Sequence, residues 1–386
     1  MTREEVEMTD TTEYTNRRIH NMEAILLALS AMVVVACGSG APAASPTVSS
    51  TPVDSPTPVT SPASITSPTT DVSPYPLADG EAWIVLDNGG VGEAGGARLI
   101  RPDGTDGHEI LADLPVNVAA PAWSPDGRQL VFDGEGDRGS QPWVANADGT
   151  GARALIPTPD GCPSHCTEGI QPTWSRDGRS IAYVASTHEV GVFTRSALAI
   201  LDIATGETRE VYATTDTTLA WPSWSPDGRT IAIEIDQYAD APEDSQIVSS
   251  VIGLIAVEGA DHAPREITEP SLLAGYPSWH PTDDLIVVRT NRYDVDREAV
   301  LDEAAPSDLY TMRADGSGLT NITQNVVGGA IIRAPSWTSD GRILFSKLAE
   351  AGAEEQLRVI DATGEGEASA TGDVVTVGEG YWRPTP

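Results

Sequence analysis

The chain has 386 residues and a formal net charge of −34, from 57 acidic and 23 basic side chains. Such an acidic chain argues against binding to nucleic acid, whose phosphates need a basic surface, and against docking on anionic lipid by charge. The remaining interpretations are a surface that serves solubility and a surface that recognises cations or basic partners.

The beginning of the chain has the pattern of an export signal. An apolar run, Ala24–Ala36, follows the basic pair Arg17-Arg18 and is shorter than the roughly 20 residues that a membrane span needs. The exit sequence Val34–Cys37 resembles the lipobox of bacterial lipoproteins. The resemblance implies that residues 1–36 are a signal peptide, cleaved before Cys37, and that Cys37 carries the lipid. The alternatives are an ordinary signal peptide and an uncleaved anchor.

The next segment predicts a tether. Residues 41–75 consist almost entirely of Ala, Pro, Ser, Thr and Val, and such a composition cannot bury enough apolar surface to offset its ordering entropy. We therefore expect residues 37–75 to be a disordered Ser/Thr/Pro-rich linker. It would keep the following domain outside the cytoplasm and close to the bacterial cell membrane.

One short phrase then repeats through the rest of the chain. Five copies are intact: Pro121–Gly127, Pro172–Gly178, Pro222–Gly228, Pro277–Asp283 and Pro335–Gly341. A sixth is divided between Tyr381–Pro384 at the end and Asp79-Gly80 near the start. Successive repeat tryptophans, from Trp123 to Trp382, are 45 to 58 residues apart. A propeller blade of four strands needs about 40 to 50 residues, so each period fits one blade and its loops.

Each period also has the composition of a blade. A Pro-x-Trp strand leads into a Ser-Pro-Asp-Gly turn, an apolar strand follows, and a hairpin with a Gly turn completes the unit. The segments 81–87, 97–101 and 108–112 supply three strands whose fourth is Tyr381-Trp382. We predict an all-β fold, a six-bladed β-propeller over residues 76–386, closed by N- and C-terminal strands that share one blade. An open β-sandwich or several small domains is the alternative.

The repeated Trp-Ser-Pro-Asp-Gly phrase resembles the repeat of the TolB-type β-propeller family, over about four fifths of the chain. The resemblance implies a propeller that works through protein contacts on one face. Several positions depart from the repeat, and we expect them to alter turns only: Arg176, His280, Thr282, Asp283, Thr338 and Ser339. TolB itself has an α/β domain before its propeller, and the tether stands in that place here.

The repeated residues have a structural explanation. We expect the repeat tryptophans to pack between adjacent blades: Trp123, Trp174, Trp224, Trp279, Trp337 and Trp382. A carbohydrate platform is the alternative for such a ring of aromatic residues. The repeat aspartates are expected to cap turns: Asp126, Asp177, Asp227 and Asp340.

The chain has 3 cysteines, of which Cys37 belongs to the lipobox. For an exported protein we predict a disulfide between Cys162 and Cys166. A thiolate metal site with His165 is the alternative, although it offers fewer ligands than a structural Zn site requires.

Acidic residues gather in loops that a propeller places on one face. These loops join the second and third strands of a blade, and we predict that they contact a partner: Glu135, Asp137, Asp240, Glu243, Asp244, Asp294, Asp296, Glu298, Asp302 and Glu303. The run Asp294–Glu298 begins like a Ca²⁺-binding loop. Ala299 and Ala305 then stand where an EF-hand needs Gly and Glu, so Ca²⁺ is only an alternative ligand. We assign no metal and no cofactor.

The sequence offers no catalytic constellation that we can assign. It lacks a Gly-x-Ser-x-Gly elbow, and its six histidines are spread along the chain. We therefore predict a monomeric, non-enzymatic scaffold that binds proteins of the cell envelope. Two alternatives remain: a sensor that binds a metal or small ligand in the channel, and an enzyme acting on envelope glycans or peptides through His188 or a loop carboxylate.

Overall fold

The structure is a computed structural model, and it describes residues 77–87, 95–136, 139–156, 165–189, 192–238, 247–259, 261–291, 306–324, 329–349, 353–372 and 380–384. These residues belong to a compact unit that the chain forms from Pro74 onward. Among them, no helix combines the length and the apolar character that crossing a membrane requires.

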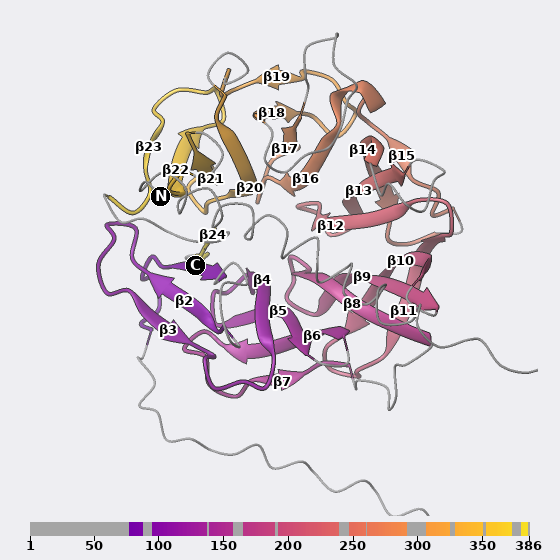
Figure 1. Ribbon diagram of the computed structural model, residues 1–386, viewed down its shortest axis with the longest axis horizontal. Coiled ribbons are helices and arrows are strands. Elements are labelled where there is room, and N and C mark those ends of the chain that lie inside the picture. Colours follow the sequence, from indigo (N-terminus) through magenta and orange to yellow (C-terminus); the bar gives the residue numbers. More distant parts are fainter. Residues whose placement is uncertain are drawn as a thin grey trace, which may run out of the picture. The chain divides into compact units, whose positions relative to one another are not determined.

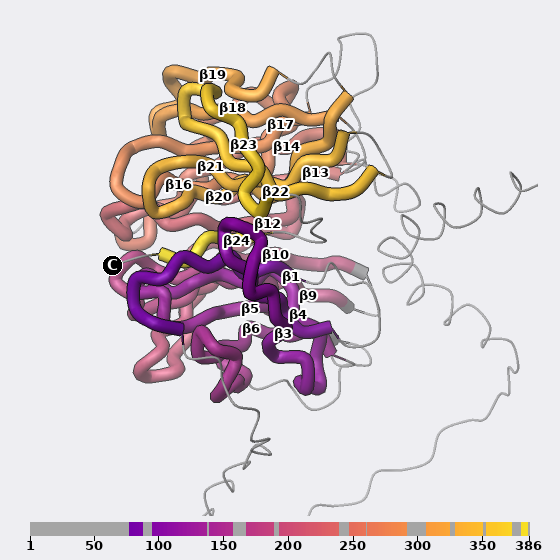
Figure 2. Tube along the Cα trace, turned by 90° about the vertical axis from the view of Figure 1, so that its left-hand side faces the viewer, coloured from indigo at the N-terminus to yellow at the C-terminus, as the bar shows by residue number. Residues whose placement is uncertain are grey.

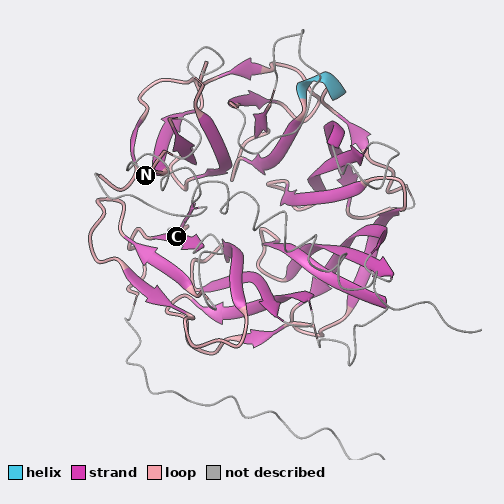
Figure 3. Ribbon diagram, viewed as in Figure 1, coloured by secondary structure: helices cyan, strands magenta, loops and turns pink. Residues whose placement is uncertain are grey.

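Six four-stranded antiparallel sheets stand around a common axis as the blades of a propeller (Figure 1). Almost every described element is a strand, and the short 3₁₀ helix η1 (Pro270–Leu272) precedes blade 5 (Figure 3). Blade 1 contains β24 (Gly380–Trp382), β1 (Ile84–Asp87), β2 (Ala97–Ile100) and β3 (His108–Ile110). Blade 2 contains β4 (Asn117–Trp123), β5 (Gln129–Gly136), β6 (Gly139–Asn146) and β7 (Arg153–Ala154). Blade 3 contains β8 (His165–Trp174), β9 (Ser180–Glu189), β10 (Val192–Asp202) and β11 (Thr208–Thr214).

The remaining blades repeat this order. Blade 4 contains β12 (Thr218–Trp224), β13 (Thr230–Tyr238), β14 (Ile247–Ala256) and β15 (Arg265–Glu266). Blade 5 contains β16 (Ala274–Trp279), β17 (Ile286–Thr290), β18 (Asp308–Met312) and β19 (Thr320–Asn321). Blade 6 contains β20 (Ile331–Trp337), β21 (Arg342–Leu348), β22 (Gln356–Asp361) and β23 (Ala368–Ser369). The prediction of an all-β, six-bladed propeller is confirmed.

The ring is closed by the two ends of the chain, as the divided sixth repeat predicts. Strand β24 pairs with β1 in antiparallel register, with Ile84 opposite Trp382 and Leu86 opposite Gly380. Arg383 then lies almost fully buried, and its Nε donates to the carbonyl of Gly127 at 2.8 Å. Its Nη1 donates to the carbonyl of Ala78 at 3.0 Å. Arg383 therefore joins the last strand to both blade 1 and blade 2.

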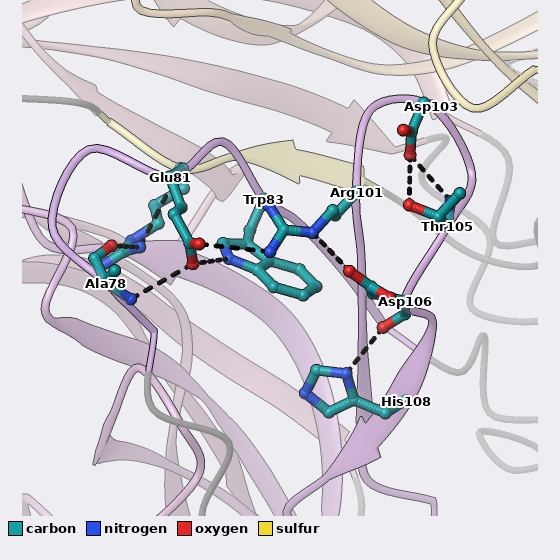
Figure 4. Close-up of polar contacts among 9 residues, drawn as sticks. Ala78, Glu81, Trp83, Arg101, Asp103, Thr105, Asp106 and His108 are labelled. Carbon is teal, nitrogen blue, oxygen red and sulfur yellow. Dashed lines mark hydrogen bonds and ion pairs between the residues drawn. The ribbon is translucent and has the colours of Figure 1, made fainter.

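A polar network stabilises blade 1 beside this junction (Figure 4). The guanidinium of Arg101 lies 4.4 Å from the ring of Trp83 and pairs with Asp106 at 2.7 Å. Glu81 accepts from both Arg101 and the indole of Trp83, each at 3.3 Å. The partly exposed charges are each worth little, but together they connect the segment before β1 with the turn between β2 and β3.

Six hydrophobic clusters form the core, and each combines the facing sheets of two neighbouring blades. Five repeat tryptophans lie in these clusters with 4% to 8% of their surface exposed, and Trp382 packs half-buried against the sixth. A ring of interfaces of this kind is rigid because no blade can move without opening two cores.

The motif turns show why their polar residues recur. In blades 2, 3 and 4 the motif serine donates its Oγ to the aspartate two residues later at 2.7 Å. The aspartate also accepts the amide of the residue two positions further on. Thr338 makes the same contact with Asp340 in blade 6. In blade 5, His280 takes this role, since its Nδ1 accepts the amides of Thr282 and Asp283 at 3.2 and 2.9 Å.

Candidate functional site

The propeller has two distinct faces. We call the face with the motif turns the turn face, and the opposite face, where second strands lead into third strands, the loop face. The tryptophan pairs mark a common level near the turn face, with Trp174 opposite Ile181 and Trp224 opposite Ile231. From this level the second strands run toward the loop face, so a longer second strand reaches further beyond the disc.

Among the described residues, the strands of blades 3 and 4 extend furthest toward the loop face. Strands β9, β10, β13 and β14 have 10, 11, 9 and 10 residues, whereas β1, β2, β17 and β18 have only 4 or 5. At about 3.3 Å per residue, the extra residues raise these strand ends by about 15 Å. Tyr238 and Val248 lie at this raised edge and are 38% and 47% exposed.

The structure locates only part of the predicted partner surface. Glu135, predicted in a loop, lies inside strand β5 near its loop-face end, and it is exposed. The other nine residues lie outside the described residues: Asp137, Asp240, Glu243, Asp244, Asp294, Asp296, Glu298, Asp302 and Glu303. Cys37 and Cys162 also lie outside them, and Cys166 is described only as a backbone position of β8 opposite His188.

The sequence did not indicate a set of buried side chains that recurs at the same level of each blade. In the second strand of each blade, the residue three positions after the one opposite the repeat tryptophan is buried: Asp87, Asp133, Val184, Glu234, Arg289 and Ser346. The residue type at this position varies between blades, from Asp and Glu to Val, Arg and Ser, unlike the repeated turn residues. The sequence signal that could have indicated such a position is an ionisable residue at the end of an apolar strand, as Arg289 follows Leu285–Val288.

Two of these carboxyls satisfy the backbone of the next blade. The first strands bulge one residue before the motif proline, where five residues have φ between 43° and 54°: Ala120, Gln171, Trp221, Tyr276 and Ala334. The Gln171 amide donates to Asp133 Oδ1 at 2.8 Å, and the Tyr276 amide donates to Glu234 Oε2 at 2.9 Å. Val184 cannot accept a hydrogen bond, and in its blade Gln171 Oε1 accepts the Trp221 amide at 2.8 Å.

Glu234 and Asp236 form a buried carboxyl pair on β13. Burial raises the pKa of Glu234 well above its ordinary value, and the charge of Asp236 raises it further. Burial also raises the pKa of Asp236 to about 6. A Cβ on Gly275 would lie 2.6 Å from Glu234 Oε1, so the neighbouring strand must have glycine there. Both carboxyls of the pair therefore favour the protonated form more than exposed carboxyls do.

Two aromatic rings and an arginine lie beside this carboxyl pair. The rings of Trp221 and Tyr276 stack with centroids 4.4 Å apart, and the guanidinium of Arg289 lies 5.6 Å from the Tyr276 ring. Arg289 is 3% exposed, and its Nε and Nη2 have no hydrogen-bond partner among the described residues. Glu234, Arg289 and the two stacked rings thus lie together where blades 4 and 5 meet.

Arg176 connects three blades on the turn face, which the sequence did not predict. Its Nη2 donates to the carbonyl of Trp279 at 3.0 Å and lies 3.5 Å from that of Trp224. We expected replacement of the motif proline to alter only the turn of blade 3. The longer side chain instead reaches blades 4 and 5, because a guanidinium spans a gap that proline cannot.

Four histidines have described side chains, and they lie apart: His108, His188, His262 and His280 are on blades 1, 3, 4 and 5, and each makes local contacts. His165 is described only as a backbone position of β8, next to Cys166, which pairs with His188. Within the described ranges, no group of three or more His, Cys, Asp or Glu side chains is arranged to hold a metal ion.

No family model matches the chain. It is 26% identical over 271 residues to the uncharacterized protein Atu1656 of Agrobacterium fabrum, a match that covers 60% of this chain and 85% of that protein. Among solved structures, TolB from Acinetobacter baumannii superposes with a TM-score of 0.56 at 13% identity, over 79% of this chain and 66% of that one. A protein described as TolB from Agrobacterium tumefaciens gives 0.51 at 18% identity, over 78% of this chain and 98% of that one. About a third of the Acinetobacter chain thus has no counterpart in the match. The chain has the β-propeller fold of the TolB proteins.

Proposed function

We propose that the chain is a lipid-anchored, extracytoplasmic scaffold that binds a protein of the bacterial cell envelope through its loop face. The observation that carries this proposal is the raised loop-face edge of blades 3 and 4, where Tyr238 and Val248 are exposed. Arg383 bonds the carbonyls of Ala78 and Gly127, so the first described residues and the last strand meet on the turn face. In the side view of Figure 2 the C-terminus lies at the left edge of the disc.

The loop face supplies the contact surface in this proposal. The raised strands of blades 3 and 4 and the exposed Glu135 would contact a partner in the envelope. The lipid on Cys37 and the linker of residues 37–75 would hold this face near the membrane at a high effective concentration.

The rigid ring suits such a role. Six closed blade interfaces fix the loop bases, so a partner orders little of the protein when it binds. In this proposal the scaffold is a monomer and needs no cofactor, and its partner carries a basic patch that complements the acidic loops.

Photo-crosslinking in cells tests the proposal. A photoreactive amino acid replaces Tyr238 or Val248 on the loop face, and the matched control places it at Thr150 or Glu365, which are exposed on turn-face hairpins of blades 2 and 6. We expect one saturable protein adduct from the loop face only. Equal adducts from both faces, or none from the loop face, would overturn the proposal.

The anchor has its own test. Replacing Cys37→Ser should abolish metabolic labelling with a radioactive fatty acid and release the protein from the membrane fraction. Unchanged labelling of that variant would remove the anchor from the proposal.

A further inference from the structure

The motif turn of blade 5 is held by a histidine in place of the repeated serine and aspartate. In the turns of blades 2, 3, 4 and 6, the amide of the motif glycine donates to the carbonyl of the first turn residue at 2.8 to 3.1 Å. The corresponding amide of blade 5, that of Asp283, donates instead to Nδ1 of His280 at 2.9 Å. The amide of Thr282 donates to the same atom at 3.2 Å. Across the described residues 280–283, no bond between backbone atoms replaces these two.

These two hydrogen bonds require a neutral imidazole. A ring nitrogen accepts an amide only through its lone pair, so Nδ1 of His280 must carry no proton in this turn. The serine hydroxyls of the other turns do not titrate in the same range. Hydrogen bonds from the motif serines lower the pKa values of Asp177 and Asp227, so these aspartates lose their charge only in stronger acid. Of the five motif turns that the structure describes, that of blade 5 thus depends on the protonation of a histidine.

The surroundings of the ring oppose a positive charge on it. The His280 side chain is 13% exposed, and its ring packs edge-on against Trp337 of blade 6 with centroids 4.6 Å apart. Burial lowers the pKa of His280 below its ordinary value of 6.5, Asp283 opposes this shift, and the guanidinium of Arg176 adds to it. Because the pKa is lowered in the folded chain, the turn has its full stability above about pH 6.5 and loses it as the pH falls through the folded-state pKa.

Other charged groups lie on the elements beside this turn. The turn of blade 6 is close to the ring, since a Cβ on Gly341 would lie 3.3 Å from His280 Nε2. Its two charged residues, Asp340 and Arg342, pair with each other at 2.9 Å. Toward blade 4, three charged residues line a groove together with Thr282 and Asp284: Asp227, Asp261 and Arg265. Of all these described groups, Asp283 and Arg176 are the ones whose charges act on His280.

We propose that the motif turn of blade 5 is an acid-sensitive switch. As the pH falls, Nδ1 of His280 takes up a proton, releases the amides of Thr282 and Asp283, and donates instead to the Asp283 carboxylate, 3.7 Å away in this structure. Residues 280–283 then leave their turn, while β16 and β17 remain paired from Trp279 and Ile286 onward. An extracytoplasmic chain, as proposed above, would meet the pH of its surroundings directly. The switch lies on the turn face, so its failure would leave the loop-face scaffold proposal standing.

Hydrogen–deuterium exchange of the full chain, followed by mass spectrometry between about pH 5 and about pH 7.5, is the first test. Each exchange rate is divided by the intrinsic rate at the same pH. We expect the protection of residues 280–285 to fall about tenfold from pH 7.5 to pH 5, because two hydrogen bonds are lost. The matched turns of blades 2, 3 and 4 should change by less than about twofold: 124–129, 175–180 and 225–230. Constant protection in blade 5, or an equal loss in all four turns, would overturn the proposal.

The second test assigns the effect to His280. The triple variant His280→Ser/Thr282→Asp/Asp283→Gly gives blade 5 the Ser-Pro-Asp-Gly turn of blades 2 and 4, and it should keep its protection at about pH 5. The control His262→Ser removes a histidine of blade 4 and should lose protection in blade 5 as the parent does.

A histidine titration by NMR completes the test. The ring resonances of His280, assigned by their loss in His280→Ser, should titrate with a midpoint below about 6.5 that coincides with the loss of protection. A midpoint above 6.5, two different midpoints, or a triple variant that loses protection like the parent would overturn the proposal.

Discussion

The buried carboxyl pair predicts that the propeller becomes less stable as the pH rises from about 4 to about 6. Asp236 has a pKa of about 6 in the folded chain, against 3.8 for an exposed aspartate. Between these values the folded state binds more protons than the unfolded state, so unfolding releases a proton and is favoured by higher pH. Glu234, whose pKa burial also raises, extends the same trend to higher pH.

The size of the effect follows from the shift. About two pKa units at about 1.4 kcal/mol each give about 3 kcal/mol of stability lost by Asp236 across this range. Asp236→Asn keeps the shape of the side chain and cannot ionise, so it should remove this part of the pH dependence. Above about pH 6 the variant should be more stable than the parent by about this amount, and the difference should shrink toward zero as the pH falls to about 4.

Urea unfolding monitored by tryptophan fluorescence, at several values between about pH 4.5 and about pH 7.5, measures the difference. This range avoids the turn aspartates Asp177 and Asp227, whose lowered pKa values make them lose stabilisation only in stronger acid. Glu365→Gln, which removes an exposed carboxylate, should follow the parent curve. Parallel curves for the parent and Asp236→Asn would refute the reasoning.

Three further changes test the ring closure at β24 and the contacts between neighbouring blades, by urea unfolding at neutral pH. Arg383→Ala should cost about 3 kcal/mol, because it leaves buried carbonyls at the ring closure without their donor, and a loss below about 0.5 kcal/mol would contradict that role. Gln171→Ala should cost about 1 to 3 kcal/mol by leaving the Trp221 amide without its acceptor, while Gln171→Glu, which keeps an acceptor, should restore most of the loss. Gly275→Ala should cost at least about 1 to 3 kcal/mol by displacing Glu234, and the double change with Glu234→Ala should cost less than the sum of the single changes.

The sequence predicts the ring because its signals repeat. The Pro-x-Trp strands, the Ser-Asp turns and the divided sixth copy each occur at blade spacing, so the number of blades and their closure could be read from the spacing alone. The tryptophans lie in the interblade clusters because a large ring at one depth in each blade can be buried only against the next sheet.

The one-off residues could not be read in the same way. Asp133 and Glu234 meet the bulge of the following blade across the interface, about 40 residues further along the chain, and no local pattern shows that a bulge amide needs an acceptor there. Arg176 is similar, since its contact with Trp279 crosses two interfaces. Such contacts depend on the curvature of the closed ring, which spacing alone does not fix.

The central claim, a scaffold that binds through its loop face, is tested most directly by comparing crosslinked adducts from the two faces in the same cells. The account predicts one protein, captured from Tyr238 and Val248, lost on competition with unmodified protein, and missing from Thr150 and Glu365. Capture of that protein equally from Thr150 or Glu365, or no capture at the raised edge of blade 4, would contradict the account.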